Sequence, residues 1–92
     1  MSNSTEQFLV HAEQVLRKIL MYAGSGELAV PVEQLDYVKA EIHKMKDVVA
    51  AGHLPPQNVR YPILTQLIVD QWPLGHSLGK AISELEGEYR KL

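Results

Sequence analysis

The sequence predicts an all-α protein, a small four-helix bundle with short connections. Apolar residues recur at spacings of three and four in four successive segments, which is the spacing of one face of an α-helix. No segment alternates apolar and polar residues for long enough to indicate a strand. The 92 residues suit a single helical domain, residues 1–92, and the 46% apolar and 22% charged residues are an ordinary globular mixture.

The first helix is expected over residues 5–23. Ser4 suits its N-cap, Gln7 stands three residues later as in a capping box, and Gly24 suits the position just beyond the helix. At 100° per residue its apolar residues fill an arc of about 160°, which is wide enough for two neighbouring helices. They are Phe8, Leu9, Ala12, Val15, Leu16, Ile19, Leu20, Tyr22 and Ala23.

The second helix is expected over residues 31–51, with Pro31 as its first helical residue and Gly52 as its end. Its apolar residues draw a single narrow stripe with steps of 3, 4, 3 and 4. They are Leu35, Val38, Ile42, Met45 and Val49. The two prolines of "HLPPQN", residues 53–58, then predict a stiff, extended connector.

The third helix is expected over residues 59–72. Its apolar residues cover most of the circumference, so we expect it to lie between other helices or under a partner. Pro73 disfavours helical geometry at Trp72, so the helix should not continue beyond this residue through the segment "DQWP".

The fourth helix is expected to begin between Pro73 and Ser77 and to run to Arg90, with one apolar stripe. That stripe consists of Leu78, Ile82, Leu85, Tyr89 and Leu92. Gly75, Gly79, Ser83 and Gly87 follow each other at spacings of four. Only the first two border the stripe, so we expect close packing or a helix start there and a surface position for Gly87.

The segment "GHSLG", residues 75–79, resembles the G-x-S-x-G nucleophile elbow of α/β-hydrolases. That elbow needs a buried strand before the serine, and an acid and a histidine after it. The residues before Gly75 include Pro73, and no histidine follows Ser77. Ser77 is therefore not interpreted as a nucleophile, and it suits the N-cap if Gly75 precedes the helix. The same segment resembles the end of a P-loop but lacks its spacing and its Ser or Thr after the lysine.

No catalytic residue, cofactor or metal is expected, and the protein is interpreted as not being an enzyme. The chain has no cysteine, which excludes disulfides, thiolate zinc sites and cysteine nucleophiles. His43 and Asp47 stand one helical turn apart and would supply two metal ligands, whereas a zinc site needs three or four.

The composition favours a cytoplasmic protein without nucleic-acid or membrane partners. The first residues do not resemble a secretory signal, and the longest apolar stretch, broken by Thr65 and Gln66, is too short to span a membrane. A chain without cysteine suits a reducing compartment. The net charge of −2, with both signs interspersed, provides no field that attracts nucleic acid or an anionic membrane.

Some apolar residues fall outside the predicted core faces, which indicates a surface for a protein partner. The candidate partner-binding residues are Met21, Tyr37, Val48, Val69 and Trp72. We therefore expect a protein that acts by protein–protein interaction, as a homodimer or with an unknown partner.

Two alternatives stay open at this point. One is a DNA-binding transcriptional regulator, because "GHLPP" followed by "AISELEGEY" loosely resembles the helix-turn-helix half of a winged-helix repressor. The last helix, however, offers only Lys80, Arg90 and Lys91 as basic residues. The other alternative is an immunity or antitoxin-like inhibitor of a partner protein, by analogy of size and helical class.

Overall fold

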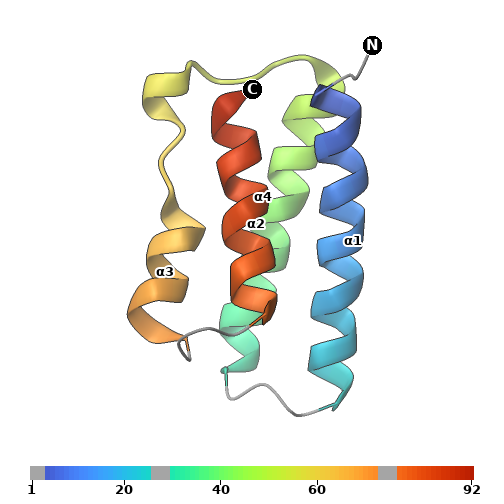
Figure 1. Cartoon of the computed structure of the whole chain (residues 1–92), viewed down its shortest axis with the longest axis vertical. Coiled ribbons are helices and arrows are strands. Elements are labelled where there is room, and N and C mark those ends of the chain that lie inside the picture. Colours follow the sequence, from blue (N-terminus) through green and yellow to red (C-terminus); the bar gives the residue numbers. More distant parts are fainter. Residues whose placement is uncertain (1–3, 26–29, 73–76) are drawn as a thin grey trace.

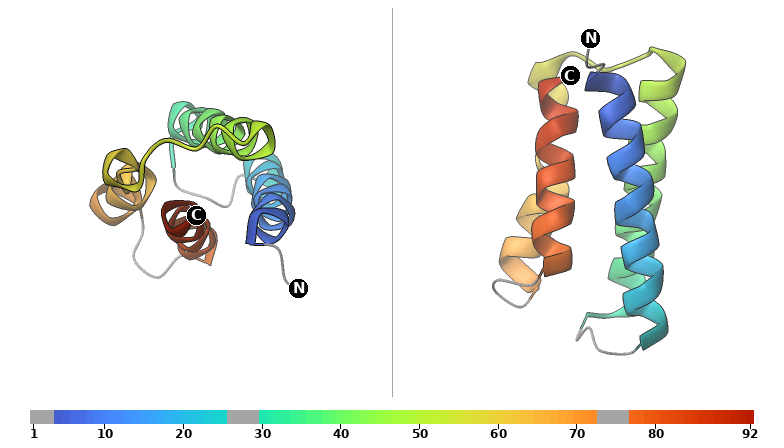
Figure 2. Two further views of the ribbon diagram at one scale, coloured as in Figure 1. Left: turned by 90° about the horizontal axis from the view of Figure 1, so that it is seen from above. Right: turned by 45° about the vertical axis from the view of Figure 1, so that its right-hand side comes forward.

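The computed structural model describes residues 4–25, 30–72 and 77–92. Within these ranges the chain forms four α-helices and a short 3-10 turn, and no strand. The elements are α1 (Ser4–Ser25), α2 (Val32–Ala51), η1 (Gln57–Val59), α3 (Ile63–Gln71) and α4 (Ser77–Lys91). The long helices α1, α2 and α4 run along the bundle, and the shorter α3 packs on α4 (Figure 1, Figure 2). The predicted all-α four-helix bundle is confirmed.

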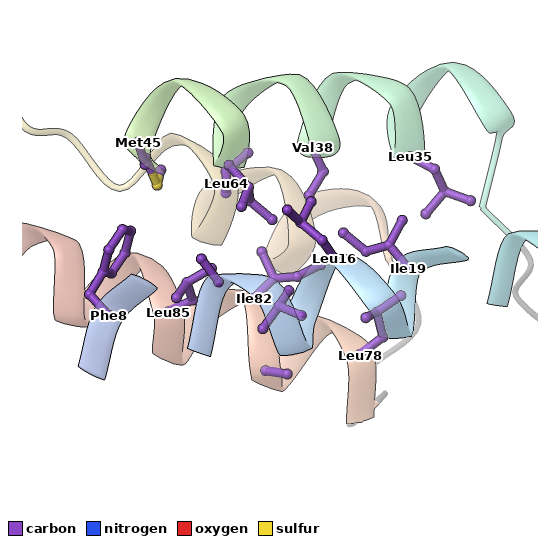
Figure 3. Packing of buried hydrophobic residues seen from close by; sticks show 14 of the residues in the cluster. Phe8, Leu16, Ile19, Leu35, Val38, Met45, Leu64, Leu78, Ile82 and Leu85 are labelled. Atoms are coloured by element: carbon purple, nitrogen blue, oxygen red, sulfur yellow. The ribbon is translucent and has the colours of Figure 1, made fainter. Parts of the chain in front are cut away.

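The core lies between the facing stripes of the helices, and the predicted stripes of α2 and α4 supply much of it. Figure 3 shows side chains from all four helices pointing toward one another. The buried apolar residues are Phe8, Ala12, Val15, Leu16, Ile19, Val30, Leu35, Val38, Ile42, Met45, Val49, Leu64, Trp72, Leu78, Ala81, Ile82 and Leu85. All five residues of the predicted α2 stripe are among them.

Helix α1 is longer than expected and buries a narrower face. It continues through Gly24, the predicted stop, to Ser25. Leu20, assigned to the core face, is 59% exposed, and Ala23 is exposed too. At 100° per residue Leu20 lies about 120° from Phe8, at the edge of the predicted arc, where neither α2 nor α4 covers it.

Helix α2 ends as predicted at Gly52, which adopts the left-handed conformation with φ 73°. The Gly52 N–H donates to Val49 O at 3.2 Å and the His53 N–H to Val48 O at 3.0 Å, the bond pattern of a Schellman motif. At the other end Pro31 is the N-cap and not the first helical residue.

Helix α3 begins at Ile63, four residues later than expected, because Val59 belongs to η1. Pro62 disfavours helical geometry at Tyr61, so one helix cannot run through both segments. The connector from α2 crosses one end of the bundle before it descends to α3 (Figure 1). At the far end Trp72 is extended, with ψ 157°, as its place before Pro73 predicts.

Helix α4 begins at Ser77 in the described part of the chain, and Gly75 lies outside the described residues. Gly79 is buried where α3 crosses α4: a Cβ there would meet Ile68 Cγ2 at 2.9 Å. Gly87 has no such neighbour within 4 Å. The predicted difference between these two glycines is therefore confirmed.

Candidate functional site

The structure exposes most, but not all, of the residues predicted to bind a partner. Met21 is 73% exposed, Val69 66% and Tyr37 45%, and Val48 is half-buried. Trp72 is only 4% exposed, and its ring N–H donates to Gln34 Oε1 at 3.0 Å. This side chain belongs to the core and not to the exposed surface where its position in the sequence placed it.

The exposed candidates do not form one patch. Tyr37 and Val48 share a face of α2, whereas Met21 lies on α1. Val69 is on α3, about 140° around the helix from the side on which Ile63 and Leu67 lie. Only the α2 pair is therefore brought together.

The shared face of α2 also carries two charged residues, Glu41 and Lys44. With Tyr37 and Val48 they fall within about 60° of one another around the helix. The Lys44 Nζ lies 3.2 Å from Glu41 Oε1, and the lysine side chain is 73% exposed whereas the glutamate is 18% exposed. This set of four residues is called the α2 face below.

Residues 57–63 lie beside the α2 face and are called the wall below. The sequence did not predict this segment as a surface. Three of its apolar side chains are exposed: Tyr61 at 66%, Val59 at 47% and Ile63 at 39%. They were assigned to the third helix, which was expected to lie between other helices or under a partner, and not to a separate segment. The pair Tyr61–Pro62 was the signal that could have separated this segment from the helix.

A groove of about 240 Å³ runs between the α2 face and this wall. Its lining is mainly apolar and aromatic, with one acidic and two basic side chains. The lining residues are Glu41, Lys44, Met45, Val48, Pro55, Val59, Arg60, Tyr61, Ile63 and Tyr89. The groove is therefore suited to an apolar or aromatic side chain and not to a strongly charged ligand.

Arg60 fastens the wall to the end of α4. The residue is 6% exposed, and its Nη1 donates to the Tyr89 carbonyl oxygen at 2.6 Å while the guanidinium lies 5.6 Å from the centre of the Tyr89 ring. In return the Arg90 Nε donates to the Arg60 carbonyl oxygen at 2.9 Å, and the Gln57 amide donates to Lys91 O at 3.3 Å. The wall is thus bonded to the end of α4 at Gln57 and at Arg60.

The start of α3 is fixed by Glu86, which is 1% exposed. Its two carboxylate oxygens accept the backbone N–H groups of Leu64, at 2.9 Å, and Thr65, at 2.8 Å. These N–H groups belong to the first turn of α3, where no residue of that helix can accept them, and Pro62 at the N-cap provides no side-chain acceptor. Glu86 therefore acts as an N-cap supplied by another helix.

Burial also affects Tyr89, at the inner side of the groove. Loss of solvent raises the pKa of its phenol above the ordinary value of 10.0, and the nearby Arg60 guanidinium offsets part of that rise. The Phe8 ring lies 5.8 Å from that of Tyr89 between centres, so the phenol is bordered by an apolar neighbour.

The geometry around Ser77 gives no support to a nucleophile elbow. The last described helix before it is α3, which ends at Gln71, and no described residue before it forms the strand that the elbow needs. The Ser77 hydroxyl lies 3.0 Å from the hydroxyl of Tyr22 at an exposed position. His76 lies outside the described residues. Ser77 is the first helical residue of α4 and not the residue before the helix, so its predicted role as an N-cap is wrong.

Among residues 4–25, 30–72 and 77–92, no group of three or more His, Asp or Glu side chains could hold a metal ion. Nor does any helix in them combine the length and apolarity that crossing a membrane requires.

The groove and the α2 face thus lie side by side on the described chain and share Glu41, Lys44 and Val48. No protein-family model matches the sequence, and no curated protein matches it significantly.

Proposed function

We propose that the protein acts by protein–protein contact, through the α2 face and the wall of residues 57–63, and not by catalysis. The observation that carries the proposal is the cluster of exposed apolar side chains around the groove, among them Tyr61, Val59 and Ile63. Contiguous apolar surface of this kind costs solubility and is typical of sites that a partner covers. Tyrosine is among the residues enriched at the energetic centre of interfaces.

The rigidity of the wall supports the same function. Hydrogen bonds from Arg60, Arg90 and Gln57 hold this wall on α4 before any partner arrives. A surface that is already ordered loses less conformational entropy on binding. A second copy of the chain is one partner that such a surface would take, in agreement with the homodimer expected from the sequence.

The DNA-binding alternative receives less support from the arrangement of basic groups. Arg90, one of three basic residues on α4, uses its Nε for the Arg60 carbonyl oxygen. Lys80 lies at the opposite end of the helix, more than two turns away. A recognition helix needs neighbouring basic or amide side chains directed at base edges.

The proposal is tested with two single substitutions of exposed apolar residues. Tyr61→Glu places a charge on the wall, and Met21→Glu places one on α1, away from the groove. We expect the wild-type protein and Met21→Glu to associate, with themselves or with a protein captured from the producing cells, and Tyr61→Glu to lose this association. Sedimentation velocity measures self-association, and affinity capture measures association with another protein. Far-UV circular dichroism checks that each variant is folded.

Two results would count against the proposed function. One is a wild-type protein that stays monomeric at high micromolar concentration and captures no protein. The other is equal loss of association in both variants, which would mean that the groove is not the contact surface. Retention on heparin at low salt would instead favour nucleic-acid binding, because a protein of net charge −2 should not be retained.

A further inference from the structure

The α2 face has an internal symmetry that makes it complementary to itself. Its residues Tyr37, Glu41, Lys44 and Val48 are separated by 4, 3 and 4 positions, a spacing that reads the same in both directions. At 1.5 Å per residue the face extends about 16 Å along the helix. The two outer residues are apolar, and the two inner residues carry opposite charges.

We propose that α2 pairs with α2 of a second copy, antiparallel, about a two-fold axis that passes between Glu41 and Lys44. This inference rests on the proposed function and names the partner. In this arrangement Tyr37 lies opposite Val48 of the second copy, and Glu41 lies opposite Lys44 of the second copy. Each contact occurs twice, as the symmetry of a two-fold dimer requires.

The charges favour a second copy over an unrelated helix. Within one chain the Lys44 Nζ already lies 3.2 Å from Glu41 Oε1. When two such pairs meet in antiparallel helices, they form a cluster of four alternating charges. Each charge then lies next to an opposite charge of its own chain and next to one of the second copy. A parallel pairing would instead bring like charges together, which is unfavourable.

The groove gives Tyr37 of the second copy a place to bind. Val48 lines this groove together with Val59 and Tyr61. Since Tyr37 of the second copy lies opposite Val48, its ring is directed to the groove, and the converse holds at the other end of the contact. Tyr37 is 45% and Tyr61 66% exposed in the single chain, so the dimer covers aromatic surface that is otherwise in water.

Small residues beside the α2 face leave room for this approach. Ala40 and Ala51 are exposed and fall within about 40° of Lys44 around the helix. Helices pack at about 8–10 Å between axes, and short side chains favour the lower part of that range. The inner pair of charges can then meet without a steric barrier at the flank of α2.

The decisive experiment mixes two charge-reversed variants, Glu41→Lys and Lys44→Glu. Each variant alone places like charges opposite each other at two points, and we expect its dimer to weaken by about tenfold or more in Kd. In an equimolar mixture, both charged positions of the first variant are basic and both of the second are acidic. Every contact between the two variants therefore joins opposite charges, and we expect the mixture to regain the wild-type dimer mass in sedimentation equilibrium.

The mixture distinguishes the contact between two copies from an effect within one helix. The ion pair between positions 41 and 44 of one chain is lost in both variants, so only a contact between chains can restore the dimer. Asp36 and Lys39 provide a matched control, since their charged atoms form another i, i+3 pair on α2, at 3.9 Å, away from the α2 face. Asp36→Lys and Lys39→Asp, alone or mixed, should leave the dimer Kd unchanged.

A second measurement tests the register. The chain has no cysteine, so Tyr37→Cys and Val48→Cys each introduce a single thiol. A short bismaleimide should join the two variants when they are mixed and should join neither variant to itself, because like positions lie about 16 Å apart along the paired helices.

Failure of the α2 pairing can be distinguished from failure of the proposed function. A wild-type dimer whose charge-reversed variants do not complement each other would overturn the α2 pairing and leave protein contact through the groove standing. A wild-type monomer that captures another protein through Tyr61 would overturn it in the same way. Restored mass in the mixture together with the mixed cross-link would support it.

Discussion

The Glu86 carboxylate on α4 accepts the backbone N–H of Leu64 on α3 at 2.9 Å, and so one helix caps another. A second carboxylate bond, from the Thr65 N–H, makes the contact bidentate. Without Glu86 both donors would be buried or half-buried and unpaired.

Glu86→Ala should therefore lower the free energy of unfolding by about 2–3 kcal/mol, the range for loss of a charged hydrogen-bond acceptor at a buried site. Denaturant unfolding measures this, and amide exchange at Leu64 and Thr65 should accelerate more than in the core of α2. Glu84→Ala is the control, since Glu84 is exposed on the same helix and its change should stay within about 0.5 kcal/mol. Equal effects of the two substitutions would remove the capping role.

Shortening a core side chain should lower the stability of the protein. Ile42 is fully buried, and Leu85 is 1% exposed. Each changed to Ala should lose about 2–5 kcal/mol of stability through lost burial and a residual cavity. Val10→Ala, at a site 58% exposed, should be close to neutral. If Ile42→Ala and Leu85→Ala unfold like the wild type in urea, the described core is wrong.

The two described glycines of α4 should respond oppositely to a side chain. Gly79→Leu would force its Cβ to within 2.9 Å of Ile68 Cγ2 and press on Trp72, so it should cost about 1–3 kcal/mol. Gly87 has open space around it, and Gly87→Ala should stabilise the helix by up to about 1 kcal/mol. Thermal melting compares these variants with Gly79→Ala and Gly87→Leu. Similar changes in melting temperature at positions 79 and 87 would contradict the close approach of α3 to α4 at Gly79.

Trp72 reports on the junction between α2 and α3. Because it is buried and bonded to Gln34, Trp72→Ala should lower stability by about 3–5 kcal/mol without changing the mass of the folded species. Trp72 is the only tryptophan, so native fluorescence should shift to longer wavelength on unfolding. An emission maximum typical of water-exposed indole in the native protein would show that the side chain is not in the core.

The raised pKa of Tyr89 predicts alkaline sensitivity. The folded protein holds the phenol proton to a higher pH than the unfolded chain does, so the unfolded state binds fewer protons above about pH 10. The contribution of Tyr89 to stability is thus fully present below about pH 10 and is lost as the pH rises through the folded pKa. Urea midpoints of Tyr89→Phe should fall less between about pH 9 and 11 than those of the wild type, and an equal fall in both proteins would contradict this role of Tyr89.

The helices and their buried stripes could be predicted from sequence because they depend on local periodicity. Ile42 and Leu85 were placed correctly by spacing alone. Leu20 was not, because it lies at the edge of the predicted arc, and the width of the face that is buried depends on the neighbouring helices and not on local periodicity. Trp72 was misplaced because it is extended and lies just after the end of α3. The 100° rotation per residue that places side chains around a helix therefore does not apply to its side chain.

The candidate surface could be predicted only in part. Tyr37 and Val48 were found because they lie off the core stripe of α2. The wall was missed because its position depends on bonds to residues far along the chain, such as that of Arg60 to Tyr89. No local pattern marks Glu86 as a cap for α3, because the two partners are 22 residues apart.

The separation between the wall and its anchors affects the order in which the protein forms during synthesis. Residues 57–65 bond to groups that lie 21 to 34 positions later in the chain. At about 5–20 residues per second, a ribosome takes about 1–7 s to make the intervening stretch. For that time the groups on α4 that hold the wall by hydrogen bonds have not been made. Nascent chains arrested before α4 is made should therefore be cut by protease within residues 53–65, whereas chains that include Lys91 outside the ribosome should be protected there.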